Sequence, residues 1–341
     1  MYKSVIRPLF FKLQPETIHH IIVGGMKVVG YIPFAKALIK SCHCVKSSSL
    51  EREVIGLKFP NPIGLAAGFD KNAEVYDVLS CMGFGFVEIG TVTPKAQSGN
   101  PKPRMFRLPK DKAIINRMGF NNEGLKAAVR RLRSRNPKLI IGGNIGKNTT
   151  TPNEKAAEDY LKLFRGLYDY VDYFVVNVSC PNVANLTSLQ SKQSTIDILM
   201  PLKEFRKGQK QYRPILLKIS PDLSTEQVDT MIEVVRQTKI DGIVATNTTT
   251  SRGGLATDDD DVKRIANGGL SGAPLTERSR EMVRYIHQKT GGKIAIIGVG
   301  GIMSVQDAKE MLAAGASLVQ VYSGFIYEGP GFVKSILKYL K

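Results

Sequence analysis

The sequence of 341 residues predicts an α/β fold, a (β/α)8 TIM barrel that follows a small N-terminal helical extension. Three observations lead to this fold class. Short apolar segments with Gly, Asn or Thr at their ends recur from residue 62 onward. Stretches with apolar residues at helical spacing lie between most of these segments, as in alternating strand–helix folds. The length fits one barrel of ~250 residues with an appendage.

The apolar segments are the expected barrel strands. They lie at residues 62–68, 85–91, 139–146, 172–178, 214–220, 241–247, 294–300 and 317–323. The clearest helices are expected at residues 154–170, 224–238, 276–290 and 304–315, where Ser, Thr or Asn caps precede an apolar periodicity. A doubly wound open sheet would need GxGxxG in its first strand–helix turn, and GLAAGFDKN at residues 64–72 lacks it. Barrels of this kind place their active sites at the carboxyl ends of the strands, where the polar residues of this chain cluster.

The first part of the chain, residues 1–45, differs from the barrel, which we assign to residues 46–341. It predicts two short helices, the second beginning near Pro33. Its expected apolar face consists of Leu9, Phe10, Phe11, Leu13, Ile18, Ile21, Ile22 and Val23, and the flanking cations are Lys3, Arg7, Lys12, Lys27, Lys36 and Lys40. This composition is typical of a helix that lies in a membrane interface, and a helical pair packed on the barrel explains it equally well.

Charge and cysteine content limit the possible partners and compartments. The net charge of +18 predicts an acidic partner, which is nucleic acid, anionic lipid or a phosphorylated cofactor. No stretch approaches the ~20 apolar residues of a membrane span, and we expect no signal peptide. The four cysteines (Cys42, Cys44, Cys81 and Cys180) are too few for a disulfide framework, so we expect a reducing compartment. Cys42-His43-Cys44 supplies no fourth ligand, so we expect no metal.

Several strand ends carry residues suited to an anionic heterocyclic ligand. GVGGI at residues 298–302 and YSGF at 322–325 follow the seventh and eighth strands, where barrels commonly bind phosphate through backbone N–H groups. These glycines also suit a tight turn. Lys71 and Lys218 follow or occupy apolar strands, and a lysine such as Lys218 is costly to bury unless it meets an anion. The amides of Asn144, Asn177, Asn182 and Asn247 suit a flat heterocycle, and they also suit turns.

A family resemblance rests on motifs spread along nearly the whole chain. These are GLAAGFDKN, EIGTVTPKAQSGNPKPRMFRLP, INRMGFNN, NIGKN, VNVSCPN, ATNTT, GGLSG, IIGVGG and YSGF. Together they resemble dihydroorotate dehydrogenase, the flavoprotein of pyrimidine biosynthesis. The N-terminal helices resemble the extension of the class 2 branch, which is quinone-dependent and membrane-associated.

The resemblance implies a role for each matching position. Those that match FMN-binding positions are Ala67, Gly68, Thr91, Asn144, Asn177, Lys218, Thr246, Gly272, Gly301, Tyr322 and Ser323. Those that match orotate-binding positions are Lys71, Asn116, Arg117, Met118, Gly119, Phe120, Asn177, Asn182, Asn247 and Thr248. Arg107 and Tyr322 match the quinone passage. We therefore expect FMN, dihydroorotate or orotate, a membrane quinone and an anionic membrane surface as partners of a monomeric, peripheral protein on the cytoplasmic side of the cell membrane, with no nucleic acid.

One position departs from the class 2 pattern. The residue after Ser179 is a serine in that pattern, where it acts as the base that removes a proton from C5 of dihydroorotate. This chain has Cys180, as class 1 enzymes do. A thiol with an unperturbed pKa of ~8.5 reaches its basic form near neutral pH more readily than a hydroxyl does. We expect Cys180 to be the catalytic base, although a buried, inert cysteine is the more frequent case.

The sequence leaves three alternative functions open. The same reaction with a soluble acceptor such as fumarate would fit Cys180. A flavin-dependent RNA dihydrouridine synthase would fit the positive charge, but those proteins carry an RNA-docking domain after the barrel, and this chain ends soon after YSGF. A non-catalytic membrane-binding module is a third alternative. Because residues 1–45 contribute no strand-end motif, we expect the extension to serve only the quinone half of the reaction.

Overall fold

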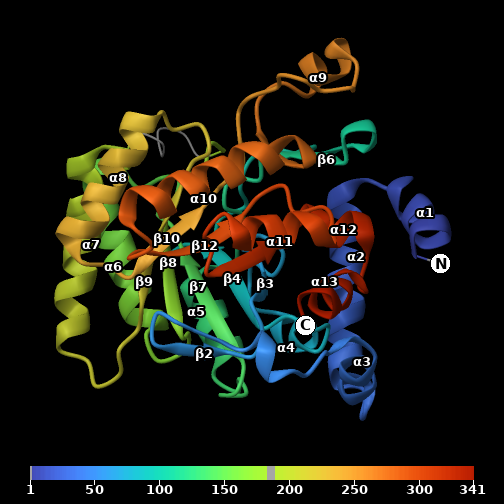
Figure 1. Ribbon diagram of the computed structural model, residues 1–341, viewed down its shortest axis with the longest axis horizontal. Helices are drawn as coiled ribbons and strands as arrows, with labels where there is room; N and C mark the ends of the chain where they lie inside the picture. Colours follow the sequence, from blue (N-terminus) through green and yellow to red (C-terminus); the bar gives the residue numbers. More distant parts are fainter. Residues whose placement is uncertain (1, 183–188) are drawn as a thin grey trace.

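The computed structural model describes residues 2–182 and 189–341, and its centre is a closed barrel of eight parallel strands (Figure 1). Around the barrel these are β3 (Ile63–Leu65), β4 (Phe86–Val92), β7 (Ile140–Ile145), β8 (Tyr173–Asn177), β9 (Ile215–Ile219), β10 (Gly242–Ala245), β12 (Ala295–Val299) and β13 (Leu318–Val321). The barrel closes where β13 pairs with β3. The predicted fold class is confirmed, and each strand lies within a segment predicted from the sequence, except that β4 runs one residue beyond its segment, to Val92.

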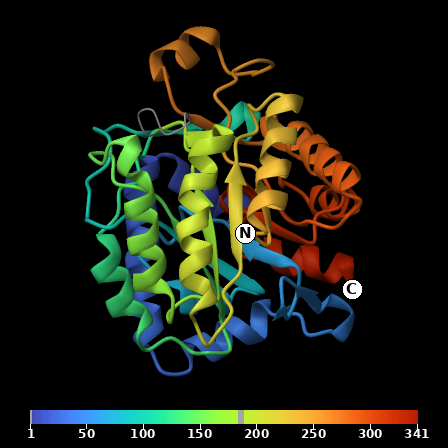
Figure 2. The same ribbon diagram turned by 90° about the vertical axis from the view of Figure 1, so that its left-hand side faces the viewer.

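Helices cover the outside of the barrel (Figure 2). They are α4 (Tyr76–Ser80), α5 (Gly124–Leu132), α6 (Ala156–Leu167), α7 (Lys192–Lys207), α8 (Thr225–Thr238), α10 (Thr276–Thr290), α11 (Val305–Ala313), α12 (Ser323–Glu328) and α13 (Phe332–Leu340). Side-chain caps fix where some of them begin. Ser224 and Gln227 form a reciprocal capping box at α8, and the Ser304 hydroxyl accepts from the Asp307 N–H at α11. The four helices predicted from the sequence are confirmed.

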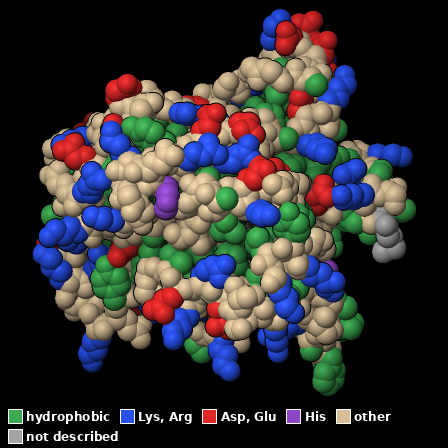
Figure 3. Space-filling view, in the orientation of Figure 1, with side chains coloured by type: hydrophobic (Ala, Val, Ile, Leu, Met, Phe, Trp, Pro, Cys, Tyr) green, Lys and Arg blue, Asp and Glu red, His purple; other side chains and the backbone are tan. Residues whose placement is uncertain are grey.

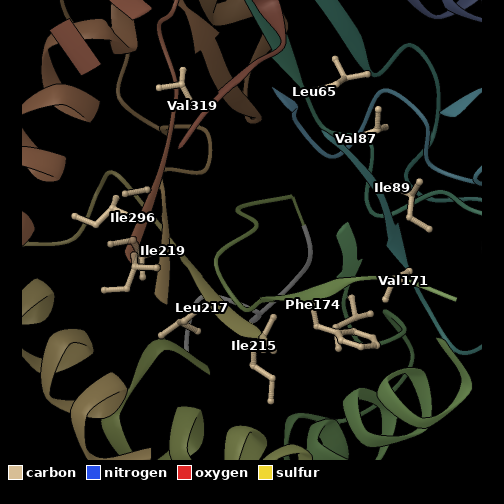
Figure 4. Packing of buried hydrophobic residues seen from close by; sticks show 14 of the residues in the cluster. Leu65, Val87, Ile89, Val171, Phe174, Ile215, Leu217, Ile219, Ile296 and Val319 are labelled. Atoms are coloured by element: carbon tan, nitrogen blue, oxygen red, sulfur yellow. The ribbon is translucent and has the colours of Figure 1, made fainter. Parts of the chain in front are cut away.

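Alternation along each strand decides which residues reach the barrel interior. In β9, Ile215, Leu217 and Ile219 pack against the surrounding helices (Figure 4). Successive side chains of a strand point to opposite faces, so Leu216 and Lys218 face inward. The pattern places Lys218, which is 6% exposed, inside the barrel rather than on the surface.

The amino-terminal end of the barrel is closed by aromatic residues. Phe86 and Tyr173 lie inside it. Phe86 fits because residue 64 is a glycine, and a side chain there would overlap the Phe86 ring. A hairpin of β1 (Arg52–Val54) and β2 (Leu57–Phe59) covers this end, with Phe59 packed edge-on against Phe86 at 5.2 Å. Side chains therefore fill the barrel interior at its amino-terminal end, and the barrel is open only at its carboxyl end.

A second sheet, which the sequence did not reveal, lies at the carboxyl end. It consists of β5 (Met105–Leu108), β6 (Ala113–Asn116) and β11 (Gly269–Gly272), all antiparallel. Asn116 pairs with both Met105 and Gly269, so this sheet joins segments about 150 residues apart. A short helix, α9 (Asp259–Ile265), projects from the connection before β11 (Figure 1). The sheet forms a roof over the barrel mouth.

The N-terminal extension contains more helices than the two predicted. After a π-helical turn at Tyr2–Ile6 come α1 (Arg7–Phe11), α2 (Pro15–Tyr31) and α3 (Ala35–His43). The helix predicted near Pro33 corresponds to α3, but the number of helices was wrong. Pro15 holds Gln14 in an extended conformation, so α1 and α2 cannot form one helix, and Pro15 then occupies the first turn of α2. No single helix in the described parts of the chain is long and apolar enough to cross a membrane, but α2 and α3, bent by 113° at their junction, pass the same test as a pair.

The expected apolar face of the extension is divided between two surroundings. Ile18 and Val23 are buried against the rest of the protein, whereas Leu9, Leu13 and Ile21 are exposed. The extension also contacts the end of the chain: the Tyr2 hydroxyl donates to the Ile326 carbonyl at 2.6 Å. One side of the extension therefore packs on the barrel, as one of the two alternatives predicts, and another side faces outward.

Candidate active site

A pocket with about 1100 Å³ of empty space, counted out to its open mouth, lies between the carboxyl ends of the strands and the roof sheet. Most of the residues predicted from the sequence line it. They are Ala67, Gly68, Lys71, Thr91, Asn116, Met118, Gly119, Phe120, Asn177, Cys180, Asn182, Lys218, Thr246, Asn247, Thr248, Gly272, Gly301, Tyr322 and Ser323.

Three predicted residues lie outside the lining. Asn144 is fully buried just beneath it and acts through neighbouring side chains. The Arg117 side chain points away, donating to the carbonyls of Asn267 and Pro103 and lying over the Phe106 ring. Arg107 lies against the extension. Arg117 therefore contributes no side chain to the pocket, although its neighbours Asn116 and Met118 line it.

The strand-end amides form one connected belt across β4, β7, β8 and β10. The Thr91 hydroxyl donates to Asn144 Oδ1 at 2.6 Å, and Asn177 Nδ2 donates to both Thr91 and Asn144 at 3.1 and 3.2 Å. Asn247 Nδ2 donates to Asn177 Oδ1 at 3.2 Å and to the Ser179 hydroxyl at 3.0 Å. These bonds fix the orientation of each amide, which a ligand with imide groups requires.

A buried carboxylate below this belt was missed by the sequence analysis. Glu88 is fully buried in β4 and accepts from Asn144 Nδ2 at 2.8 Å and from Gln320 Nε2 at 2.6 Å. Burial lowers the pKa of Lys218, while Glu88 and Cys180 act in the opposite direction. The signal that singled out Lys218, an ionisable residue in an apolar strand, also applies to Glu88.

Lys71 is the cation at the side of the pocket. Its Nζ donates to the Gly68 carbonyl at 2.7 Å, and burial lowers its pKa to about 8. His19 of the extension lies nearby, with its ring edge-on to Phe69 at 5.1 Å. Burial, followed by the charge of Lys71, lowers the pKa of His19 to about 3, so the imidazole is neutral at working pH. His19 lies in the extension pattern LFFKLQPETIHH, which resembles class 2, but no role was predicted for it.

Cys180 follows the end of β8 and is 8% exposed, in the lining of the pocket. Ser179, its neighbour, is fully buried and is bonded to Asn247. Lys218 is near enough for a charged Cys180 to raise its pKa, so a Lys218 cation in turn favours negative charge on the thiol. The arrangement gives Cys180 an electrostatic partner as well as access to a ligand.

An apolar wall joins the pocket to the extension. The Tyr322 ring, which lines the pocket, lies edge-on to Phe69. Farther out, Phe11 of α1 lies edge-on to Tyr327 at 5.2 Å, and the Arg107 guanidinium covers the Phe11 ring at 4.6 Å. Burial raises the pKa of Tyr322 to about 12, so its phenol is neutral.

No group of three or more His, Cys, Asp or Glu side chains that could hold a metal ion occurs in residues 2–182 and 189–341. None of the described cysteines forms a disulfide. Cys44 Sγ lies 3.6 Å from the Cys81 carbonyl, away from the pocket lining. Cys180 is therefore the cysteine that the fold places at the site.

Comparison with known proteins agrees with this geometry. The family model for dihydroorotate dehydrogenase matches residues 49–341. The chain belongs to the dihydroorotate dehydrogenase family. It is 56% identical to dihydroorotate dehydrogenase (quinone) of Christiangramia forsetii, over 98% of this chain and 97% of that protein. It is 46% identical to the protein of the same name from Coxiella burnetii, over 100% of this chain and 97% of that one.

Solved structures of the family share the fold closely. DHODH from Eimeria tenella in complex with ferulenol matches with a TM-score of 0.86 at 35% identity, over 96% of this chain and 90% of that chain. The family predicted from the motifs is confirmed, and the relatives named for quinone agree with the class 2 resemblance. Membership in this family decides against an RNA-modifying barrel and against a non-catalytic membrane module.

The residues of the pocket fit the flavin that this family implies. The turns after β12 and β13 come close to other main-chain segments: a side chain on Gly301 would overlap the Thr276 backbone, and one on Gly324 would overlap the Ile302 carbonyl. Such turns let backbone N–H groups approach a phosphate. Gln320 Oε1 is buried with no hydrogen-bond partner in the described structure, and Gln320 lines the pocket. A heterocycle with an N–H group would satisfy it.

Proposed function

We propose that the protein oxidises dihydroorotate to orotate with FMN as its cofactor and passes the electrons to a membrane quinone. The observation that carries the proposal is the pocket itself. It brings Cys180, Lys71 and Lys218 together with the amides of Asn116 and Asn182 at the carboxyl end of the barrel. Relatives that cover nearly the full chain and are named dihydroorotate dehydrogenase (quinone) support the same reaction.

The substrate is held by charge and by paired amides. Lys71 pairs with the substrate carboxylate, because a half-buried ammonium group needs an anion. The amides of Asn116, Asn177, Asn182 and Asn247 offer donors and acceptors to the imide groups of the ring. Asn182 is itself oriented, since its Nδ2 donates to Asn116 Oδ1 at 3.1 Å and its Oδ1 accepts from the Gly269 N–H at 3.1 Å.

Oxidation removes a proton from C5 of dihydroorotate and a hydride from C6, and a C5–C6 double bond forms. FMN, when bound, supplies the acceptor for the hydride. Cys180 takes the C5 proton on its Sγ, as a base in the substrate side of the pocket must. Lys218 favours the charged thiol before this transfer. The glycine turns at 300–301 and 323–324 would hold the phosphate of the cofactor, and Lys218 would lie at the flavin ring.

The extension supplies a surface for the membrane. Its largest exposed apolar side chains are Tyr31 and Phe34, 89% and 88% exposed, at the junction of α2 and α3. In Figure 3, apolar side chains protrude at the lower right of the molecule, where α3 lies, with Lys and Arg side chains near them. We propose a peripheral position on the cytoplasmic side of the cell membrane, with the quinone entering past Phe11, Arg107 and Tyr322, and a monomeric protein.

The basic rim contributes less to this surface than its sequence predicts. Three of its six cations are paired with acids of the barrel: Lys3 with Glu328, Lys27 with Glu74 and Lys36 with Asp77. Arg7 donates to the Tyr327 carbonyl at 3.0 Å. Anionic headgroups would attract free cations at roughly 1 kcal/mol each, so membrane binding depends mainly on the apolar side chains.

Two measurements test the proposed function. The purified protein should carry a flavin absorbance that dihydroorotate bleaches without oxygen. Reoxidation by a quinone should be much faster than reoxidation by fumarate. Fumarate is the second candidate acceptor because Cys180 is the class 1 residue at this position. A colourless protein, or a flavin that dihydroorotate leaves oxidised, would refute the reaction, and equal reoxidation by fumarate would refute the quinone assignment.

A further inference from the structure

The extension contributes one buried charge to the barrel. Glu16, in the first turn of α2, is 9% exposed, and its partner Arg104, just before β5, is 6% exposed. Arg104 Nε donates to both carboxylate oxygens at 3.2 Å, and Nη2 donates to Oε1 at 2.7 Å. Burial alone would raise the pKa of Glu16, but the bonds from Arg104 hold it below its usual value. The pair is charged and joined by several bonds, which fixes its geometry.

The other end of the same guanidinium holds a turn of the barrel. Arg104 Nη1 donates to the Ser98 carbonyl at 2.6 Å and to the Asn100 carbonyl at 2.8 Å. Gly99, between them, has φ +75°, and a side chain there would overlap the Met118 carbonyl. The turn at residues 98–100 is therefore pressed between Arg104 and the segment that carries Met118.

From this turn, hydrogen bonds reach the substrate side of the pocket. Asn100 Nδ2 donates to the Arg117 carbonyl at 2.9 Å and to the Asn182 carbonyl at 3.0 Å. The Asn182 side chain then donates to Asn116. Asn116 and Asn182 both line the pocket. Four bonded steps thus connect Glu16 in the extension with two amides that face the ligand.

We propose that Glu16 is a positioning residue for the dihydroorotate side of the pocket, acting through Arg104 and Asn100 on Asn182 and Asn116. The inference rests on the proposed function, which places the substrate against these two amides. Without the carboxylate, a buried guanidinium is left without its counter-ion and turns toward other acceptors, which releases the carbonyls of the 98–100 turn. The extension then serves both halves of the reaction, which differs from the expectation drawn from the sequence.

The ion pair alone could act as a simple anchor for α2, so the test separates anchoring from positioning. Glu16→Gln removes the charge at the start of the connection. Asn100→Ser cuts it beyond the ion pair, because Arg104 binds the main-chain carbonyl of Asn100 and keeps its bonds to Glu16. Lys27→Gln is the matched control: it removes another ion pair between α2 and the barrel, with Glu74, and neither of these residues lines the pocket.

The experiment uses the full-length, flavin-loaded protein. The dissociation constant of orotate is measured from the change in flavin absorbance, together with KM for dihydroorotate, KM for a short-chain quinone and the melting temperature. Because each change interrupts one polar network, Glu16→Gln and Asn100→Ser are expected to raise the dissociation constant of orotate and KM for dihydroorotate about tenfold. Both variants should leave KM for quinone within twofold of the wild-type value. Lys27→Gln should change neither the dissociation constant of orotate nor KM for dihydroorotate.

The outcomes divide clearly. An anchoring role would leave orotate affinity in Asn100→Ser at the wild-type value, and this result overturns the inference even if Glu16→Gln fails to fold. Equal losses for orotate and quinone in both variants would also overturn it. If the wild-type protein neither binds orotate nor is reduced by dihydroorotate, the proposed function fails instead, independently of the variants.

Discussion

The protonation of Lys71 should set the pH dependence of orotate binding. Burial lowers its pKa to about 8 from an ordinary value near 10.5, so the ammonium is charged below pH 8 and neutral above it. The carboxylate of orotate is attracted only to the charged form. About nine-tenths of the molecules carry the charge at pH 7 and about one-tenth at pH 9, so the dissociation constant should rise roughly tenfold, or about 1.4 kcal/mol, between them.

The assay is a titration of the flavin-loaded protein with orotate, followed by absorbance, at intervals from pH 6.5 to 9. Lys71→Met separates this effect from any titration of the ligand. The variant should bind about ten- to a hundredfold more weakly at pH 7, since a hydrogen bond to a charged group contributes about 1.5–3 kcal/mol. It should also lose the rise above pH 8. A flat wild-type profile, or a variant that keeps the wild-type slope, would refute the reasoning.

Three further predictions concern the base and the membrane surface. Cys180→Ala should slow flavin reduction by dihydroorotate by a factor on the order of 10²–10⁴ with flavin still bound, and a wild-type rate in stopped flow would remove Cys180 from the mechanism. Cys180→Ser should keep some activity with its optimum at higher pH, because a hydroxyl loses its proton less readily; an unchanged pH–rate profile would show that thiol acidity is not limiting. Tyr31→Ser combined with Phe34→Ser should lower liposome co-sedimentation at least tenfold, since each inserted apolar side chain contributes roughly 1.5–3 kcal/mol. Tyr339→Ser, which removes a 51% exposed tyrosine from α13, is the control, and equal losses in both would contradict the docking surface.

The barrel could be predicted because its signals are local. Each strand is a short apolar run, and the cost of burying a lysine in such a run singled out Lys218, which the structure places inside the barrel. The same reasoning applied to GFVEIGT and SLVQVYS would have found Glu88 and Gln320, which are both fully buried. These two residues were missed because the rule that a polar residue in an apolar strand needs a partner was applied only to the basic residue, Lys218.

The roof sheet and the Glu16 connection could not be predicted in this way. Asn116 pairs with Gly269 only because the barrel brings their loops to the same end, and neither segment has a strand pattern of its own. Glu16 and Arg104 are 88 residues apart, and in the sequence each is one charge among many. Long-range contacts of this kind depend on the completed fold rather than on local preference.

The contacts between the two ends of the chain have a consequence for its synthesis. The Tyr2 hydroxyl and the Arg7 guanidinium bind the carbonyls of Ile326 and Tyr327, and β13 completes the barrel by pairing with β3. At ~5–20 residues per second, a ribosome needs roughly 15–65 s to produce the segment that receives the first helices. Tyr2 and Arg7 are therefore synthesised long before the segment that they bind. The order of translation, as well as the finished fold, therefore decides when these N-terminal residues reach their partners, and on the proposed membrane position the extension would have that interval in which to meet the bilayer.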